Sequence, residues 1–150
     1  MSHFFKFEAD FVESLHCIPM QVRLKLDTCG VKLKLSHWNQ FTPQERQVLI
    51  SMACSTPEES RIYREFLQTL ITQKTGSPAS ELEIDPHPPW LDGQNIPKEV
   101  QDKAKEFNVF IGSEQWANLR PSQRFALIKL SRPSHENRNF YPALQEFELT

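Results

Sequence analysis

The segment IPMQVRLKLDTCGVKLKLSHWNQFTPQERQVLI, residues 18–50, returns in altered form as IPKEVQDKAKEFNVFIGSEQWANLRPSQRFALI, residues 96–128. The two segments align without a gap at an offset of 78 residues. The aligned pairs include Pro19 with Pro97, Trp38 with Trp116 and Pro43 with Pro121. Because chance seldom aligns such uncommon residues together, the pattern predicts an internal duplication. We expect a mainly α protein with two pseudo-repeated helical halves, residues 18–71 and 96–149.

Helix starts are marked clearly in the first half. Thr42 is followed by a proline and by Glu45, and Thr56 is followed in the same way by Glu59. A threonine cap with a glutamate three residues later forms a capping box, and proline suits the first helical position. We therefore expect helices to begin after Thr42 and Thr56. The apolar face of the second of these helices is expected to be Ile62, Phe66 and Leu70, joined by Tyr63 and Leu67.

Two shorter helices are expected around the aligned tryptophans. Ser36 and Ser113 precede Trp38 and Trp116 and are of a residue type that caps helix starts. Both tryptophans recur at equivalent places with leucines around them, so we expect both in the core.

Helix ends are indicated by residues that tolerate a left-handed backbone. Gly30 and Asn108 occupy equivalent positions after the first helix of each half, and Gly76 follows the longest helix. The segments after the first two, 31–35 and 109–111, read as short extended stretches. If the halves pack about a pseudo-twofold axis, these stretches could pair as a short two-stranded ribbon.

Residues 76–95, GSPASELEIDPHPPWLDGQN, form an irregular connection between the halves. Pro86, Pro88 and Pro89 exclude a regular helix or central strand there. We expect Trp90 to anchor this strap to the rest of the protein, because an indole is seldom left free in a loop. The strap could also hold an acid–base pair, Asp85 with His87, but the interpretation as a packed rigid strap is favoured.

Composition narrows the function classes. The chain has 150 residues, the usual size of one domain, so we expect a single domain, 1–150. A net charge of −2 with interleaved acids and bases gives no electrostatic case for nucleic acid. No secretory leader and no apolar run long enough for a membrane span is visible, which favours a cytoplasmic protein without membrane contact.

The cysteines and arginines have ordinary structural interpretations. Cys17, Cys29 and Cys54 lack a C-x₂-C pair, so buried reduced thiols are favoured over a metal site, and no metal or cofactor is predicted. Arg46 and Arg124, one in each half, are expected to bond main-chain carbonyls. A paired anion clamp is the alternative.

Residues 132–140, RPSHENRNF, crowd His135, Glu136, Arg138 and two asparagines between a proline and a phenylalanine. The offset of 78 aligns them with 54–62, where a helix begins, but Pro142 falls inside the expected helix. We therefore expect a separate turn here and a helix restarting near Tyr141. As a candidate partner-binding surface, this stretch offers His135, Glu136, Arg138 and Asn139, beside Asp85, His87 and Trp90 of the strap.

The chain resembles a known family over nearly its whole length. The segments that carry the likeness are FEADFVESLHCIPM (7–20), KLDTCGVKL (25–33), WNQF (38–41), IDPHPPWL (84–91) and QRFALIKLSRPSHENRNFYPALQEF (123–147). With these it resembles the nitrate reductase-associated protein family of cyanobacteria and some algae. The resemblance implies an accessory role toward an assimilatory nitrate reductase, a molybdenum and iron–sulfur enzyme, and supplies no catalytic residues.

The leading hypothesis is a non-catalytic accessory protein that binds the nitrate reductase polypeptide and aids its maturation or activity. Two alternatives remain open. One is a small ligand-binding protein or enzyme whose pocket joins Asp85, His87, His135 and Glu136. The other is a thiol metallochaperone that uses the cysteines.

Overall fold

The computed structural model describes residues 4–8, 18–133 and 137–150, and for Asn137 its backbone only. These residues are mainly helical, as the sequence predicts, with eight α-helices and no strand among them. The helical elements in chain order are η1 (Lys6–Glu8), α2 (Met20–Cys29), α3 (Leu35–Asn39), α4 (Pro43–Ser51), α5 (Pro57–Thr75), η2 (Pro89–Leu91), α6 (Lys98–Lys105), α7 (Ser113–Asn118), α8 (Pro121–Ser131), η3 (Asn137–Asn139) and α9 (Phe140–Glu146). None of the helices described is long and apolar enough to cross a membrane.

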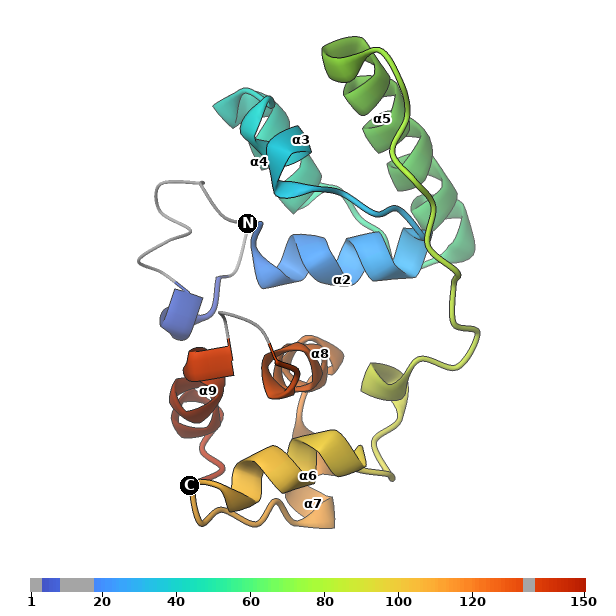
Figure 1. The fold of residues 1–150 in the computed structure, drawn as a ribbon. Coiled ribbons are helices and arrows are strands. Elements are labelled where there is room, and N and C mark those ends of the chain that lie inside the picture. Colours follow the sequence, from blue (N-terminus) through green and yellow to red (C-terminus); the bar gives the residue numbers. More distant parts are fainter. Residues whose placement is uncertain (1–3, 9–17, 134–136) are drawn as a thin grey trace. The chain divides into compact units, whose positions relative to one another are not determined.

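The described residues divide into two compact units (Figure 1). Unit 1 contains Phe4 and the described residues from Glu8 to Asp85. Unit 2 contains Phe5–Phe7 and the described residues from Pro86 onward. The boundary at Asp85 and Pro86 falls inside the connection expected at 76–95. The single domain and the internal duplication stay predictions.

Unit 1 is built on α2, which packs against both α4 and α5, while α3 packs against α5. Figure 1 shows α2 crossing one end of α4 and α5. Trp38 is fully buried, as expected, and Tyr63 is buried with its hydroxyl donating to the Leu49 carbonyl at 2.8 Å. The apolar face expected for α5 is partly wrong. Its buried residues are Tyr63, Leu67, Leu70 and Ile71, whereas Ile62 and Phe66 are 45% and 36% exposed.

The two capping boxes form as predicted. At the start of α4, the Glu45 N–H donates to Thr42 Oγ1 at 3.1 Å and the Thr42 N–H donates to Glu45 Oε1 at 2.8 Å. Thr56 and Glu59 make the same reciprocal pair at the start of α5. The short helices begin differently from the prediction, because α3 begins at Leu35, so that Ser36 lies inside the helix, and α7 begins at Ser113 itself.

The predicted helix ends are confirmed. Gly30 and Gly76 have φ of 79° and 90°, and Asn108 has φ of 59°. The Val31 N–H donates to the Leu26 carbonyl at 3.1 Å, and the Val109 N–H donates to the Ala104 carbonyl at 3.0 Å. These bonds satisfy carbonyls left over at the two helix ends, which is why both positions take residues that tolerate the left-handed region.

The expected ribbon of 31–35 with 109–111 is not confirmed. Val31 instead forms an isolated antiparallel bridge with Glu81. The Lys32 N–H donates to the Ser80 carbonyl and the Leu82 N–H donates to the Gly30 carbonyl, each at 2.8 Å. The start of the connection therefore takes up the backbone groups that the ribbon would have used.

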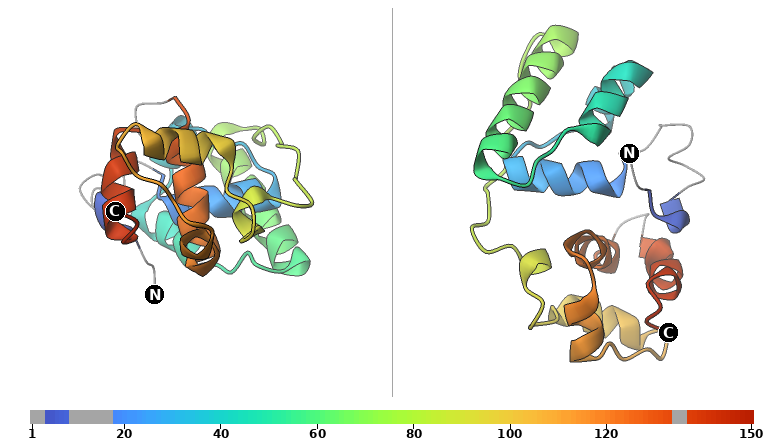
Figure 2. Two further views of the ribbon diagram at one scale, coloured as in Figure 1. Left: turned by 90° about the horizontal axis from the view of Figure 1, so that it is seen from below. Right: turned by 180° about the vertical axis from the view of Figure 1, so that it is seen from behind.

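Unit 2 is arranged around α8. This helix contacts η2, α6, η3 and α9 (Figure 2). Its buried residues are Arg124, Phe125, Ala126, Leu127, Ile128 and Leu130. Such a nearly continuous buried run means that α8 is covered around most of its circumference rather than on one stripe.

A segment from the other end of the chain also belongs to unit 2. The rings of Phe5 and Phe7 stack with centroids 5.2 Å apart, and the Phe5 ring meets the edge of Phe147 at 5.2 Å. The Phe7 N–H donates to Glu146 Oε1 at 3.1 Å. The segment of Phe5 and Phe7 is thus held to the segment of Glu146 and Phe147, although Phe7 and Glu146 are 139 residues apart, by packed rings and by a hydrogen bond to the Glu146 carboxylate.

Helix starts keep the offset of 78 residues in three cases. The pairs are Met20 with Lys98, Leu35 with Ser113, and Pro43 with Pro121. The fourth pair departs from it, because α5 begins at Pro57 whereas α9 begins at Phe140. Pro142 is the third residue of α9, so the helix restarts beside the proline as the sequence predicts.

Candidate functional site

The part of the strap that belongs to unit 2, residues 86–95, is fixed to α7 and α8 by its main chain and to α8 by one aromatic ring. The Trp90 ring packs edge-on against Phe125 with centroids 5.1 Å apart. The Trp90 carbonyl accepts from Arg124 Nη1 at 3.1 Å, and the Asp92 carbonyl accepts from Trp116 Nε1 at 2.9 Å. The favoured interpretation of a strap packed by Trp90 is therefore confirmed.

Arg124, from α8, joins the strap to the end of α7. Its Nε donates to the Trp116 carbonyl at 3.1 Å and its Nη2 donates to the Ala117 carbonyl at 2.9 Å. A side chain on Gly93 would come within 3.0 Å of Arg124 Nη2, so glycine lets the strap approach the guanidinium closely. The planar fork of arginine suits bonds to several carbonyls at once.

Asp92 closes the strap with a local turn. Its carboxylate accepts from the Gln94 N–H at 2.9 Å and from Asn95 Nδ2 at 3.0 Å. These hydrogen bonds, led by that from the Asn95 side chain, lower the pKa of Asp92. The carboxylate is thus engaged in shaping the chain.

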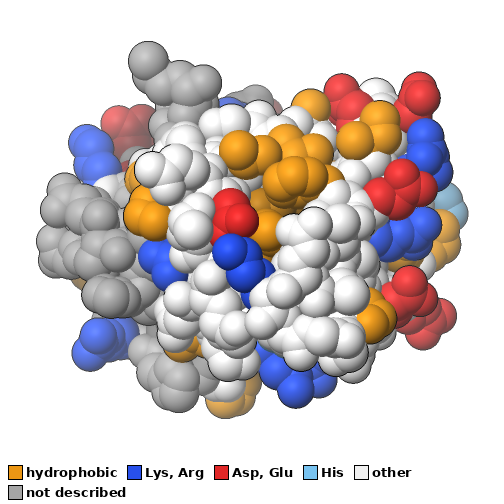
Figure 3. Space-filling view, turned by 90° about the horizontal axis from the view of Figure 1, so that it is seen from above, with side chains coloured by type: hydrophobic (Ala, Val, Ile, Leu, Met, Phe, Trp, Pro, Cys, Tyr) orange, Lys and Arg blue, Asp and Glu red, His pale blue; other side chains and the backbone are white. Residues whose placement is uncertain are grey.

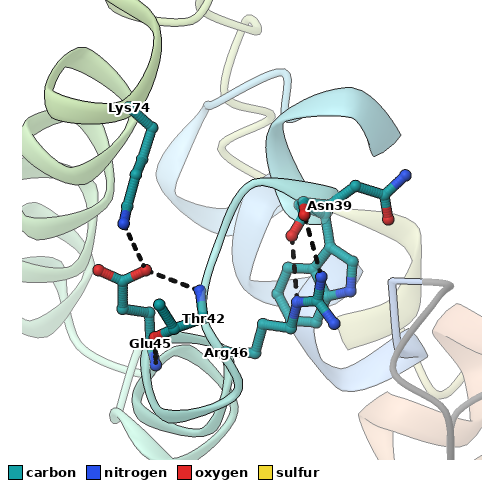
Figure 4. A network of polar contacts seen from close by, with 6 residues as sticks. Asn39, Thr42, Glu45, Arg46 and Lys74 are labelled. Atoms are coloured by element: carbon teal, nitrogen blue, oxygen red, sulfur yellow. Dashed lines mark hydrogen bonds and ion pairs between the residues drawn. The ribbon is translucent and has the colours of Figure 1, made fainter.

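Arg46 plays the equivalent part in unit 1. Its Nε donates to the Trp38 carbonyl at 3.1 Å and its Nη2 donates to the Asn39 carbonyl at 3.3 Å (Figure 4). The expectation that both arginines bond main-chain carbonyls is confirmed. In the same view, Glu45 Oε1 also meets Lys74 Nζ at 3.1 Å, which ties the start of α4 to the last turn of α5.

The second candidate segment, 132–140, also meets α8. Asn137–Asn139 form η3, which contacts α8 and α9. Arg138 is exposed and Asn139 is half-buried. His135 and Glu136 lie outside the described residues. Both candidate segments in unit 2 thus pack on the same helix, although the sequence placed them 40 residues apart or more.

A family model described as conserved nitrate reductase-associated protein matches residues 4–147. The chain belongs to this family. No curated protein and no solved structure matches the chain.

In this family member, the strap presents one exposed side chain that the sequence did not indicate, Leu91, beside the predicted candidate His87. Leu91 is 61% exposed although its backbone lies in η2, between the two bonded carbonyls of Trp90 and Asp92. His87 is exposed as well. In a sequence, both residues of a Trp-Leu pair are expected in the core. Only the packing of the Trp90 ring on Phe125 shows that Leu91 is the one that faces solvent.

Unit 1 of the family member also exposes large apolar side chains. Leu35, Val48, Ile62 and Phe66 are exposed on α3, α4 and α5. On the face seen from above, hydrophobic side chains gather in one region beside an acidic and a basic group (Figure 3). The exposure of Ile62 and Phe66 could not be predicted from the sequence, because both residues match the helical period of the buried residues of α5.

The acid–base pocket proposed from the sequence remains a hypothesis. Asp85 belongs to unit 1 and His87 to unit 2, and both are exposed, while His135 and Glu136 are among the residues left undescribed. Across the described parts of the chain, no three histidine, cysteine, aspartate or glutamate side chains are grouped so that they could hold a metal ion.

Two of the three cysteines in this family member lie together. Cys29 and Cys54 are buried in unit 1, and their thiols donate to the carbonyls of the adjacent residues Leu26 and Lys25. Buried thiols were expected, but their proximity was not. Cys17 lies outside the described residues, so the metallochaperone hypothesis stays a prediction.

Proposed function

We propose that this protein is a non-catalytic accessory protein that binds the nitrate reductase polypeptide and supports its maturation or activity. The observation that carries the proposal is membership of the nitrate reductase-associated family over residues 4–147. A binding role is also supported by the strap, where polar groups such as Arg124 and Asp92 are occupied with the protein's own chain. Groups occupied in this way hold a surface in shape rather than carry out chemistry on a substrate.

The strap is our first choice for the contact surface. Its main chain is fixed by Arg124 and Trp116, so binding a partner through it would require little ordering of the chain. Leu91 offers apolar area and His87 a polar group on this fixed segment. Arg138, exposed beside α8, offers the second contact for a partner surface.

A deletion strain tests the proposed role. Cells lacking the protein should grow normally on ammonium and slowly on nitrate, with nitrate reductase activity reduced. Measuring the reductase polypeptide separately distinguishes loss of the enzyme from loss of its activity. Normal growth and normal reductase activity on nitrate would reject the proposal.

Co-purification of the reductase with tagged variants then tests the surface. Leu91→Asp should lower the recovered reductase about tenfold or more, because a charge on a central apolar contact removes well over 1 kcal/mol of binding. Leu35→Asp is the matched control, since Leu35 is 49% exposed and an aspartate is tolerated at the first residue of α3.

Arg138→Glu tests the second contact in the same assay. If the strap and η3 both touch the reductase, the charge reversal should reduce recovery as Leu91→Asp does. Full recovery with Arg138→Glu would remove η3 from the surface, and full recovery with Leu91→Asp would remove the strap.

A further inference from the structure

The thiols of Cys29 and Cys54 sit together over the last turn of α2. Cys29 is the final residue of that helix and is 1% exposed, and Cys54 lies between α4 and α5 and is 6% exposed. Cys29 Sγ is 3.8 Å from the Leu26 carbonyl oxygen and Cys54 Sγ is 3.7 Å from the Lys25 carbonyl oxygen. The two sulfurs therefore face the carbonyls of adjacent residues in the last turn of α2.

We propose that Cys29 and Cys54 are a reversible redox pair that hydrogen peroxide converts to a disulfide. Cys54 attacks one peroxide oxygen, the O–O bond breaks, and the departing hydroxide takes up a proton and leaves as water. The sulfur of Cys29 then attacks the resulting Cys54 sulfenic acid. The S–S bond forms as the S–OH bond breaks, and the hydroxide leaves as a second water with the Cys29 proton. Two thiols and one peroxide thus give one disulfide and two waters.

The surroundings distinguish the two sulfurs. The hydrogen bond from Cys29, with support from Ser60 and the charge of Lys25, lowers the pKa of Cys54. The same thiol–thiol bond and burial raise the pKa of Cys29. Because the thiolate is the nucleophile, Cys54 is the sulfur that reacts first and Cys29 is the one that resolves the intermediate.

Access to the pair is from the side of Cys54. Ala53 and Ser55, its neighbours in the chain, are both exposed, and this stretch lies outside the helices. Cys54 itself is 6% exposed and Cys29 only 1%, so a small oxidant such as peroxide reaches Cys54 first. The hydrogen bonds to the carbonyls are long and made by weak thiol donors, so closing the disulfide gives up little.

The disulfide would join the end of α2 to the segment that precedes α5. It closes a covalent loop through α3 and α4, which restricts the unfolded chain and stabilises unit 1. This inference is independent of the proposed binding to the reductase, and it stands or falls by chemistry on the purified protein.

Peptide mapping of the full-length protein after peroxide treatment tests the pair. Trypsin places the three cysteines on separate peptides, 7–23, 26–32 and 47–61. We expect peptide 26–32 linked to peptide 47–61, with two hydrogen atoms fewer than the sum of the free peptides, and complete reversal by a dithiol. Cys17→Ser should leave this link unchanged.

The denatured protein provides the comparison. In urea, peroxide should give mixed pairings that include Cys17, whereas the folded protein should give the single link. Free 26–32 and 47–61 thiols in the treated folded protein, or the same mixture as in urea, would overturn the proposal.

Single substitutions test the order of the two steps. Cys29→Ala should leave a sulfenic acid on Cys54 that a cyclic dione traps, whereas Cys54→Ala should leave Cys29 without the adduct. Equal trapping in both variants would contradict the assigned order. Mapping of the wild-type chain decides on the pair itself even if either variant fails to fold.

Discussion

Arg124 stabilises unit 2 by joining three main-chain carbonyls from two segments, the strap and the end of α7. It is 7% exposed, so a carbonyl that lost its donor there would be poorly reached by water. Arg46 makes similar bonds to Trp38 and Asn39 in unit 1, but it is only half-buried. Arg124 is therefore expected to contribute more to the free energy of unfolding than Arg46, although the two arginines occupy aligned positions.

Replacing each arginine by lysine measures that difference. Arg124→Lys should lower the free energy of unfolding by about 2–4 kcal/mol, because one ammonium cannot reach all the carbonyls that the guanidinium serves. Arg46→Lys should lower it by about 1 kcal/mol or less, since water can replace the lost bonds. Urea unfolding followed by circular dichroism gives both values, and equal losses would contradict the argument.

Glu45 makes stability depend on pH. Its pKa is lowered from the ordinary value of 4.5, first by the hydrogen bond from the Thr42 N–H and then by Lys74. A carboxylate whose pKa is lower in the folded state than in the unfolded state stabilises the fold at pH values above its unfolded-state pKa. That stabilisation is lost as the pH falls through the folded-state pKa. Glu45→Gln should thus cost about 0.5–1 kcal/mol at pH 7 and almost nothing near pH 3.

Unfolding curves of the Gln variant and the wild type at pH 7, 5 and 3 check this prediction. Glu65→Gln is the control, because Glu65 pairs with Arg61 on the surface, is 63% exposed, and should change stability little at any of these pH values. A constant difference between Glu45→Gln and wild type from pH 7 to pH 3 would show that ionisation of Glu45 is not the cause. The capping box could be predicted from the sequence, but Lys74 could not, because it reaches Glu45 from another helix.

At the scale of elements, two glycines that end helices separate two kinds of constraint. Gly30 and Gly76 share a left-handed backbone. A Cβ on Gly30 would lie 2.8 Å from the Leu82 carbonyl oxygen, whereas nothing lies within 4 Å of a Cβ on Gly76. Gly76 is therefore constrained by its backbone alone, and Gly30 by its backbone and its neighbours.

Alanine at each glycine tests this distinction. Gly76→Ala should cost about 1 kcal/mol, the penalty for a side chain in the left-handed region. Gly30→Ala should cost about 3 kcal/mol or more, because the bridge between Val31 and Glu81 must shift to make room. Thermal unfolding of the two variants compares them directly, and equal losses would mean that the segment 80–84 moves freely.

These helix ends also show how far local sequence predicts an element. The helix ends predicted at Gly30 and Asn108 are confirmed, because a left-handed backbone restricts the residue type at that same position. The ribbon is not confirmed, because a free backbone edge pairs with whichever segment reaches it, and here Ser80 and Leu82 do so. Ser36 and Ser113 were misplaced for a related reason, since a serine fits both the cap and the first turn of a helix.

At the scale of the whole molecule, the chain passes from unit 1 to the main part of unit 2 at Asp85 and Pro86, after the short excursion of Phe5–Phe7. Residues 83–87 are exposed and lie outside the helices. Segments of this kind are the ones that proteases enter first. The prolines of the connection are visible in the sequence, but the boundary between the two units at Asp85 and Pro86 is not.

Limited digestion with a glutamate-specific protease should cut first after Glu83. Glu81 should be slower, because Val31 bridges to it and the Leu82 N–H is bonded to Gly30. Glutamates inside α5 should be protected in the folded protein, although Glu65 is well exposed as a side chain. Mass spectrometry of early fragments checks the order, and a first cut within α5 would contradict it.

The location of the candidate site could be predicted from the sequence, but the side chains that it exposes could not. The prolines and Trp90 marked the strap, and its packing on Phe125 followed from the need to cover an indole. Leu91 was missed because exposure depends on which way the strap turns, and Arg124 sets that turn from 34 positions away. The thiol pair was missed because Cys29 and Cys54 meet only after α3 and α4 have folded back between them.

The contacts of Phe5 and Phe7 with Phe147 also bear on the order of events during synthesis. Residues of unit 1 can pack as they leave the ribosome, since their partners are near in the chain. Phe5 and Phe7 emerge well before the ring of Phe147 and the carboxylate of Glu146 that receive them, because Phe7 and Glu146 are 139 residues apart. Unit 2 is therefore completed only after translation has passed Phe147, and removal of Phe5–Phe7 would damage a unit whose other described residues all follow Asp85.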